Sequence, residues 1–197
     1  MTDRVADIAA RRARVQAEMR KRGLRGLVIY FGGQHYMLRM NQLMYLTDFK
    51  ALGCAALLVP DEGLPSLIIS PPWDSSRANE EAVGVAEIIA VAPEALAGEI
   101  AARAKQELRE PFALAGSEGM TVAFSRALVA ALGEEPANAD TLVSSLAATR
   151  TPVELERIEK AATIADAGFQ ALCETARVGM WEYELAAEIE AAMHASG

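Results

Sequence analysis

Blocks of apolar residues alternate with amphipathic stretches along the first 140 positions. Four largely apolar runs predict strands, at 27–31, 54–59, 87–91 and 112–115, and the first of them is continuous enough for a strand covered on both faces. After the second run, the turn signal Pro60-Asp61-Glu62-Gly63 leads to Leu67-Ile68-Ile69, which predicts an antiparallel hairpin. Because strands alternate with helical patterns around this hairpin, the expected fold is α/β, a mixed β-sheet flanked by helices.

The amphipathic stretches predict helices with recognisable ends. The first is rich in arginine and ends at Gly23; its apolar positions are Val5, Ile8, Val15 and Met19, with Arg11, Arg12, Arg14 and Arg20 outside. We interpret these arginines as a solvated face rather than a binding arm. A short helix capped by Asp74 or Ser75 is expected to end before Gly84, and a longer helix begins near Pro93.

The pattern changes after about residue 140, where no further strand follows. Thr151-Pro152-Val153-Glu154 combines a capping Thr, Pro at the first helical position and Glu three residues after the cap, which predicts a helix running to Gly179. A second helix begins near Trp181. Because these two amphipathic helices have no sheet to cover, we expect one domain at 1–145 and, at 146–197, a linker and the first two helices of a truncated second domain.

Composition and charge narrow the class of protein. Apolar residues make up 52% and charged residues 23% of the 197 positions, as in a folded globular protein. The net charge of −8 is opposite to that of most nucleic-acid-binding proteins. A charged, amphipathic N-terminal segment and the lack of an apolar run of roughly 20 residues predict a cytoplasmic protein with no membrane partner. Cys54 and Cys173 lie within apolar patterns and are expected in the core.

No complete catalytic or metal-binding motif is present in the sequence. The two histidines, His35 and His194, lie far apart, and the spacings of zinc, phosphate-loop and serine-hydrolase motifs are absent. Gly32-Gly33 follows a predicted strand as in a dinucleotide-binding turn, but the remaining glycines of that motif are missing. We therefore expect no catalytic residue and no metal ligand in this segment.

Two segments carry side chains suited to contacting a ligand. Residues 34–42 leave the end of a predicted strand, where ligand-contacting groups often gather, and are rich in side chains that stack or donate hydrogen bonds. The alternative is an irregular surface loop whose Tyr and Met side chains pack underneath. Trp73 is either an exposed aromatic anchor or a lid on the short helix after it. Arg77 is either a contact residue or a solvated helix charge.

Three features occur in a specific order along the chain. An arginine-rich first helix leads to a buried strand, Tyr45-Leu46-Thr47-Asp48-Phe49 follows, and Arg150-Thr151-Pro152-Val153-Glu154-Leu155 opens the last helical segment. Together they resemble the creatinase / aminopeptidase P / prolidase family of pita-bread metallohydrolases. The second feature is similar to that family's Tyr-Leu-Thr-Gly-Phe segment, and the third to its Lys-Ser/Thr-x-x-Glu entry to the catalytic domain. Asp48 replaces the usual Gly, and Trp181 replaces a capping Ser or Thr.

The resemblance implies the dimerising and substrate-gating N-terminal domain of a metal-dependent Xaa-Pro aminopeptidase, dipeptidase or creatinase-like hydrolase. The two divalent metal ions of the parent enzyme and their ligands would lie beyond Gly197, so this segment would itself be non-catalytic. The implied partners are a second copy in a homodimer, the C-terminal catalytic domain and a small peptide or amide substrate. The residues implied to contact that substrate are His35, Tyr36, Arg39, Asn41, Trp73 and Arg77. The alternative function is a stand-alone α/β interaction or small-molecule-binding domain.

Overall fold

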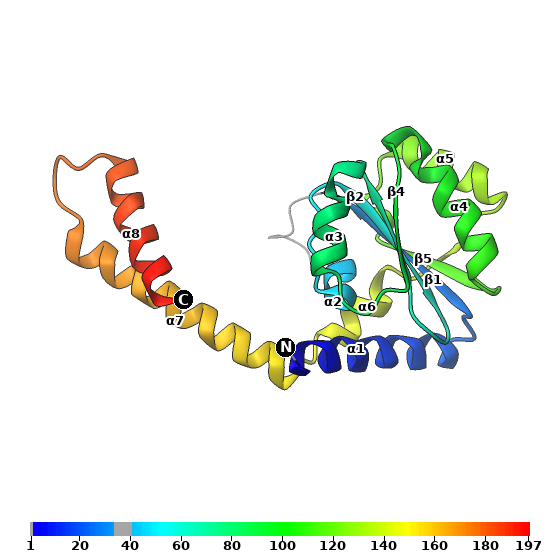
Figure 1. Cartoon of the computed structure of the whole chain (residues 1–197), viewed down its shortest axis with the longest axis horizontal. Coiled ribbons are helices and arrows are strands. Elements are labelled where there is room, and N and C mark those ends of the chain that lie inside the picture. Colours follow the sequence, from blue (N-terminus) through cyan, green and yellow to red (C-terminus); the bar gives the residue numbers. More distant parts are fainter. Residues whose placement is uncertain (1, 34–40) are drawn as a thin grey trace. The chain divides into compact units, whose positions relative to one another are not determined.

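The computed structural model describes residues 2–33 and 41–197, with side chains from Arg4 onward. By its internal contacts the chain divides into two compact units, Met1–Thr149 and Arg150–Gly197. Each is described by itself below, as unit 1 and unit 2. Figure 1 labels the helices α1–α8 and the strands β1, β2, β4 and β5.

Unit 1 is built on a six-stranded sheet with strand order β4-β3-β2-β1-β5-β6. The strands are β1 (Gly26–Gly32), β2 (Cys54–Pro60), β3 (Ser66–Ser70), β4 (Glu87–Ala90), β5 (Phe112–Ala115) and β6 (Ala137–Asn138). Strand β2 pairs antiparallel with β1 and β3, whereas the remaining neighbours pair in parallel. The predicted hairpin and mixed sheet are therefore confirmed. Because every strand except β2 runs the same way, five carboxyl ends share one edge of the sheet, called here the carboxyl edge.

Helices cover both faces of this sheet (Figure 1). The helices of unit 1 are α1 (Thr2–Lys21), α2 (Gln42–Thr47), α3 (Ser75–Glu81), α4 (Leu96–Glu107), α5 (Val122–Leu132) and α6 (Asp140–Ala147), with short 3-10 turns η1 (Pro72–Asp74), η2 (Pro93–Ala95) and η3 (Ser117–Gly119). One core cluster contains residues of α1, α2, α3 and α6, and the other contains residues of α4 and α5. The continuous apolar runs in the strands follow from this two-sided cover.

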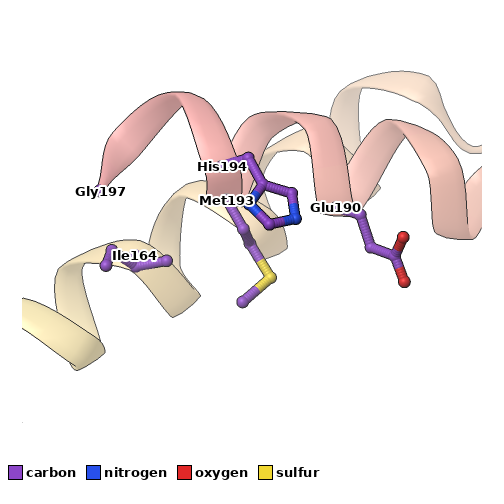
Figure 2. A pocket seen from close by; sticks show the side chains of 5 residues that line it. All are labelled: Ile164, Glu190, Met193, His194 and Gly197. Atoms are coloured by element: carbon purple, nitrogen blue, oxygen red, sulfur yellow. The ribbon is translucent and has the colours of Figure 1, made fainter. Parts of the chain in front are cut away.

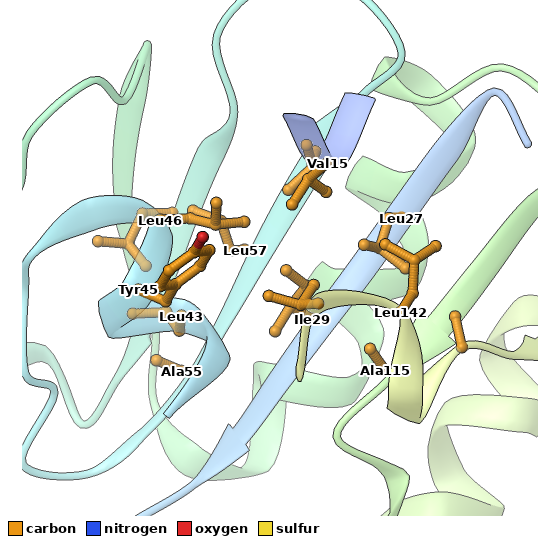
Figure 3. Close-up of a cluster of buried hydrophobic side chains, with 14 of the residues drawn as sticks. Val15, Leu27, Ile29, Leu43, Tyr45, Leu46, Ala55, Leu57, Ala115 and Leu142 are labelled. Atoms are coloured by element: carbon orange, nitrogen blue, oxygen red, sulfur yellow. The ribbon is translucent and has the colours of Figure 1, made fainter. Parts of the chain in front are cut away.

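The strand side chains alternate between the two clusters. Leu27 and Ile29 of β1 and Leu57 of β2 face the first cluster and are almost fully buried. In Figure 3 they meet Val15 from α1 and Leu142 from α6. The intervening strand residues belong to the second cluster, as the two-residue period of a strand requires. A well-packed core on each face gives unit 1 the means to fold as a domain.

The predicted solvated face of α1 is wrong, because its arginines bind the rest of unit 1. Arg11 is only 4% exposed; it pairs with Asp7, donates to the Tyr45 carbonyl at 3.2 Å and lies over the Tyr45 ring. Similar bonds to backbone carbonyls are made from Arg12 to Gly84, from Arg14 to Leu146 and from Arg20 to Asp61. A guanidinium carries five donors on a long stem, so it can satisfy carbonyls of distant loops. Val5 is 54% exposed, which corrects its assignment to the apolar stripe.

Unit 2 contains two helices, α7 (Pro152–Thr175) and α8 (Glu182–Ser196). The predicted capping box is confirmed, since Thr151 Oγ1 accepts from the Glu154 N–H and Glu154 accepts from the Thr151 N–H. The two helices approach each other at Gly168, where a Cβ atom would lie 2.7 Å from Met193 Cγ. Gly168 is the one buried residue among 150–197.

The two cysteines differ in burial. Cys173 in unit 2 is exposed, so its predicted core position is wrong, whereas Cys54 in unit 1 is half-buried.

Candidate functional site

The carboxyl edge of the sheet contains the described members of the expected contact set. Trp73 follows β3 at this edge, Arg77 lies on the helix after it, and Asn41 opens α2. His35, Tyr36 and Arg39 lie outside the described residues.

Asn41 is the N-cap of α2. Its backbone is extended, and its Oδ1 accepts a hydrogen bond from the Met44 N–H at 2.9 Å, which satisfies one of the free donors at the start of the helix. At the other end of α2, Asp48 adopts φ 56°, the left-handed conformation that Gly enters most easily and that Asp tolerates. This explains how Asp48 can replace the glycine usual in the similar family segment. Arg4 pairs with the Asp48 carboxylate and also donates to the Glu81 carbonyl.

Trp73 is an exposed aromatic side chain. It lies on η1, and 64% of its surface is accessible. Of the two alternatives left by the sequence, this exposure favours an aromatic anchor over a lid packed on α3. Leu52, in the loop before β2, is also exposed, at 57%. The Leu52 N–H donates a hydrogen bond to Asp74, the residue after Trp73, so the backbones of these two exposed apolar residues are held to the same carboxylate-bearing turn.

Arg77 is tied into its surroundings rather than projecting as a free helix charge. Its Nε donates to Asp74 Oδ1 at 3.0 Å, its Nη1 to Glu81 Oε2 at 2.8 Å and its Nη2 to the Lys50 carbonyl at 2.5 Å. The guanidinium also lies 4.8 Å from the centre of the buried Phe49 ring. Asp74 precedes α3 as expected of a cap, but its side chain makes no capping bond. The Asp74 carboxylate binds Arg77 and the Leu52 N–H instead.

Ser117, Asn138 and Asp140 form a polar cluster at the carboxyl ends of β5 and β6. The Asp140 carboxylate accepts from the Ser117 N–H at 2.9 Å, the Ser117 hydroxyl at 2.5 Å and the Asn138 amide at 2.8 Å. Burial raises the pKa of Asp140, but the hydrogen bonds from Ser117 and Asn138 outweigh it, so the pKa lies below its usual value. A carboxylate held ionised and saturated with donors is suited to tying two loops together. It is poorly suited to acting as a general base near neutral pH.

Close glycine contacts fill the space between the ends of β1 and β5. A Cβ atom on Gly32 would overlap the Gly119 carbonyl, and one on Gly116 would overlap the Tyr30 carbonyl. In doubly wound α/β sheets, ligands bind at the carboxyl ends of two neighbouring parallel strands from which the chain continues toward opposite sides of the sheet. In this sheet that pair of strands is β1 and β5. Here that space is occupied by backbone. This packing, rather than a dinucleotide, accounts for the glycine at the end of β1.

Tyr30 lies close to this point and faces the α4–α5 side. Its hydroxyl donates to Cys54 Sγ at 3.5 Å, and its ring stacks on Phe124 with centroids 4.7 Å apart. Burial, followed by the contact with Cys54, raises the pKa of Tyr30 above its ordinary value. The phenol therefore stays neutral and serves packing rather than proton transfer at neutral pH.

Within the described ranges, no three His, Cys, Asp or Glu side chains gather in a way that could hold a metal ion. Figure 2 shows a hollow of about 370 Å³ in unit 2, lined by Ile164, Glu190, Met193, His194 and Gly197. It offers only two groups that could ligate a metal, fewer than the three or more that metal sites use. In the part of the chain covered by the structure, none of the helices is long and apolar enough to cross a bilayer.

Comparison with known proteins identifies the family. The model of the creatinase/prolidase N-terminal domain matches residues 11–147. The fold is similar to that of an Xaa-Pro dipeptidase from Bacillus anthracis, with a TM-score of 0.72 and 21% identity over 96% of this chain and 50% of that one. It is similar to an X-Pro aminopeptidase from Thermotoga maritima MSB8, with a TM-score of 0.76 and 19% identity over 94% of this chain and 49% of that one.

A third solved structure matches a smaller part of the chain. An Xaa-Pro aminopeptidase from Streptococcus pyogenes aligns with 72% of this chain and with 98% of its own, at a TM-score of 0.56 and 18% identity. No curated protein matches the sequence. The chain spans about half the length of the first solved structures that it matches. On the match over residues 11–147, the chain belongs to the creatinase/prolidase family and contains its N-terminal domain.

Proposed function

We propose that this chain is the N-terminal part of a cytoplasmic, metal-dependent hydrolase that cleaves Xaa-Pro dipeptides or a related small amide such as creatine. In this proposal unit 1 forms a homodimer and limits access to the catalytic site, and unit 2 begins the catalytic domain. The single observation that carries the proposal is the extent of the structural match. Nearly the whole chain aligns with one half of an Xaa-Pro dipeptidase and of an X-Pro aminopeptidase.

The gating role rests on the exposed apolar side chains at the carboxyl edge. Trp73 and Leu52 are suited to closing over an apolar substrate side chain and excluding water from it. The remaining proposed contacts are His35, Tyr36, Arg39 and Asn41, of which the first three lie outside the described residues and Asn41 caps α2. Arg77 supports this surface through Asp74 and Lys50.

The two divalent metal ions of the proposed enzyme are not assigned to this chain. Among the described residues there is no cluster of side chains that fits them. The contribution of this chain is to bind, orient and desolvate the substrate. Such contributions act mainly on KM when they are equal in the ground and transition states.

The test uses the full-length protein and a panel of Xaa-Pro dipeptides together with creatine. Trp73→Ala is expected to raise KM for the cleaved substrate about five- to tenfold, because it removes an exposed aromatic contact. Leu64→Ala is the matched control, since Leu64 is another exposed apolar residue, at 46%, in the β2–β3 hairpin at the opposite end of these strands. Failure to cleave any of these substrates, or equal KM values in both variants, would contradict the proposal.

The alternative, a stand-alone α/β interaction or small-molecule-binding domain, is supported by one observation. The Streptococcus pyogenes chain is almost completely covered by 72% of this one, so the fold exists in a chain of about this smaller size. The backbone contact between Gly32 and Gly119 weighs against small-molecule binding between β1 and β5. A stop codon directly after Gly197 in the gene would favour this alternative, and an open reading frame encoding the metal ligands would favour the hydrolase.

A further inference from the structure

Asp74 is a buried carboxylate beside two exposed apolar residues, Leu52 and Trp73. The residue is 3% exposed, yet it lies between the exposed Trp73 and the start of α3. Its Oδ2 accepts from the Leu52 N–H at 3.0 Å and from Arg77 Nη2 at 3.1 Å, and its Oδ1 accepts from Arg77 Nε at 3.0 Å. A buried carboxylate is stable only when such donors compensate its lost hydration. Asp74 is therefore bound on both oxygens and is not free to act on a substrate.

Arg77 extends this arrangement to the loop before β2. All three guanidinium nitrogens donate hydrogen bonds, and one of them reaches the Lys50 carbonyl at 2.5 Å. The guanidinium also lies over the ring of Phe49, which is fully buried. The loop at residues 50–52 is thus attached at two points, through the Leu52 N–H to Asp74 of η1 and through the Lys50 carbonyl to Arg77 of α3. Arg77 acts here through Asp74 and the backbone rather than through contact with a ligand.

These bonds fix the backbone beside two exposed apolar side chains. Leu52 and Trp73 flank the Asp74 carboxylate and are 57% and 64% exposed. Exposed apolar side chains on loops ordinarily lose entropy when they bind, and prior fixation of their backbone reduces that loss. An ion pair with a buried member contributes little net stability by itself, so the pair of Asp74 with the partly exposed Arg77 is more important for where it holds the backbone of residues 50–52 than for overall stability.

We propose that Asp74 is a positioning residue: together with Arg77 it holds Leu52 and Trp73 as one preformed apolar surface for the apolar side chains of an Xaa-Pro substrate. This inference rests on the proposed function. It goes beyond that function by assigning Asp74, which contacts no substrate, the role of fixing the positions of Leu52 and Trp73 together with Arg77.

The first experiment measures amide hydrogen exchange in the 197-residue chain. In Asp74→Ala, exchange of the Leu52 amide is expected to rise about ten- to a hundredfold relative to that of Leu57, because a charge-assisted hydrogen bond is lost. Asp74→Asn keeps an acceptor for the Leu52 N–H and is expected to show a smaller rise. Asp61→Ala is the matched control, since Asp61 is 6% exposed, pairs with Arg25 and lies at the opposite end of β2. An unchanged Leu52-to-Leu57 ratio in Asp74→Ala would overturn the proposal.

The second experiment measures hydrolysis of an Xaa-Pro dipeptide by the full-length protein. Asp74→Asn is expected to raise KM about three- to tenfold with kcat within twofold, and Asp61→Asn to change neither. If Trp73→Ala raises KM and Asp74→Asn does not, the positioning role is overturned and the proposed function stands. If neither variant changes KM, the proposed function itself fails, whatever the exchange experiment shows.

Discussion

The two units differ in what covers their apolar residues. In unit 1 each face of the sheet has its own buried cluster, and Leu27, Ile29 and Leu57 are at most 1% exposed. In unit 2 only Gly168 is buried, and Leu155, Ile158 and Phe169 are 49%, 50% and 66% exposed. Both contain well-capped amphipathic helices. Both units therefore form helices, but only unit 1 buries the apolar side chains of its helices within itself.

This contrast separates local from tertiary contributions to stability. The capping box at Thr151 and Glu154 specifies where α7 starts, but capping contributes only about 1 kcal/mol. Most stability of a helix in a protein comes from burial of its apolar face. Unit 1 supplies that burial within itself. We propose that α7 and α8 obtain it from further chain of the full-length enzyme.

The largest expected loss of stability comes from truncating a buried leucine in unit 1, compared with a half-exposed leucine in unit 2. Leu57→Ala is expected to destabilise unit 1 by about 4 kcal/mol, because a fully buried leucine leaves a cavity. Leu155→Ala, at a half-exposed position in unit 2, is expected to change stability by less than about 1 kcal/mol. Urea unfolding followed by Trp73 fluorescence in a Trp181→Phe background measures the first, and circular dichroism at 222 nm measures both. Equal losses for the two variants would remove the distinction.

The next largest loss of stability is expected from removing an arginine that pairs with a buried carboxylate. Arg11→Met is expected to cost about 3 kcal/mol, since it leaves the buried Asp7 carboxylate without its ion-pair partner. Arg150→Met in unit 2 breaks a longer, exposed contact to Glu154 and is expected to cost less than about 0.5 kcal/mol. Adding Asp7→Leu to Arg11→Met is expected to restore part of the loss. No recovery in this double variant would show that the buried charge is not the cause.

Two glycine-to-alanine substitutions compare the stability cost of a methyl group placed against backbone in unit 1 with that of one placed against a flexible side chain in unit 2. Gly32→Ala places a methyl group against the Gly119 backbone and is expected to cost about 2–3 kcal/mol. Gly168→Ala meets the flexible Met193 side chain and is expected to stay within about 1 kcal/mol, because the gain in helix propensity offsets the displacement. Thermal unfolding of each variant measures the difference. A larger loss for Gly168→Ala than for Gly32→Ala would contradict the assignment of the tighter packing to unit 1.

The smallest effect depends on pH. The folded pKa of Asp140 lies below its ordinary value of 3.8, so its contribution is present above about pH 4 and is lost as pH falls through the folded pKa. Asp140→Asn is expected to cost about 1 kcal/mol at pH 7, and this deficit is expected to shrink below pH 4. Asp166→Asn, at an exposed position of α7, is expected to change stability at neither pH. A pH-independent deficit for Asp140→Asn would contradict the role of its charge.

The regular elements of unit 1 were predictable because their signals are local. The apolar runs located β1 to β5, and the turn at Pro60 to Gly63 located the hairpin. Helix α2 and strand β6 were missed, since six and two residues are too short to establish a period. Helix α6, which follows directly on β6, was missed as a whole.

The partners of the polar side chains were not predictable. Arg14 binds the Leu146 carbonyl 132 positions away, and nothing local in the sequence distinguishes it from a solvated arginine. Asp74 stands where a helix cap belongs, and its use for Leu52 and Arg77 depends on the loop that the fold brings beside it. The resemblance indicated the region of Trp73 and Arg77. The structure describes how these two residues differ in exposure and bonding: contact of Trp73 with substrate stays a prediction, and Arg77 is now proposed to support that surface instead of contacting the substrate.

Hydrogen–deuterium exchange of the 197-residue chain, resolved by peptide and followed by mass spectrometry, tests the central claim most directly. The account predicts that amides of β1 and β2 exchange at least about a hundredfold more slowly than those of α7 and α8, and that the helix amides gain protection in the full-length protein. Equal protection of the two units in the isolated chain would contradict it.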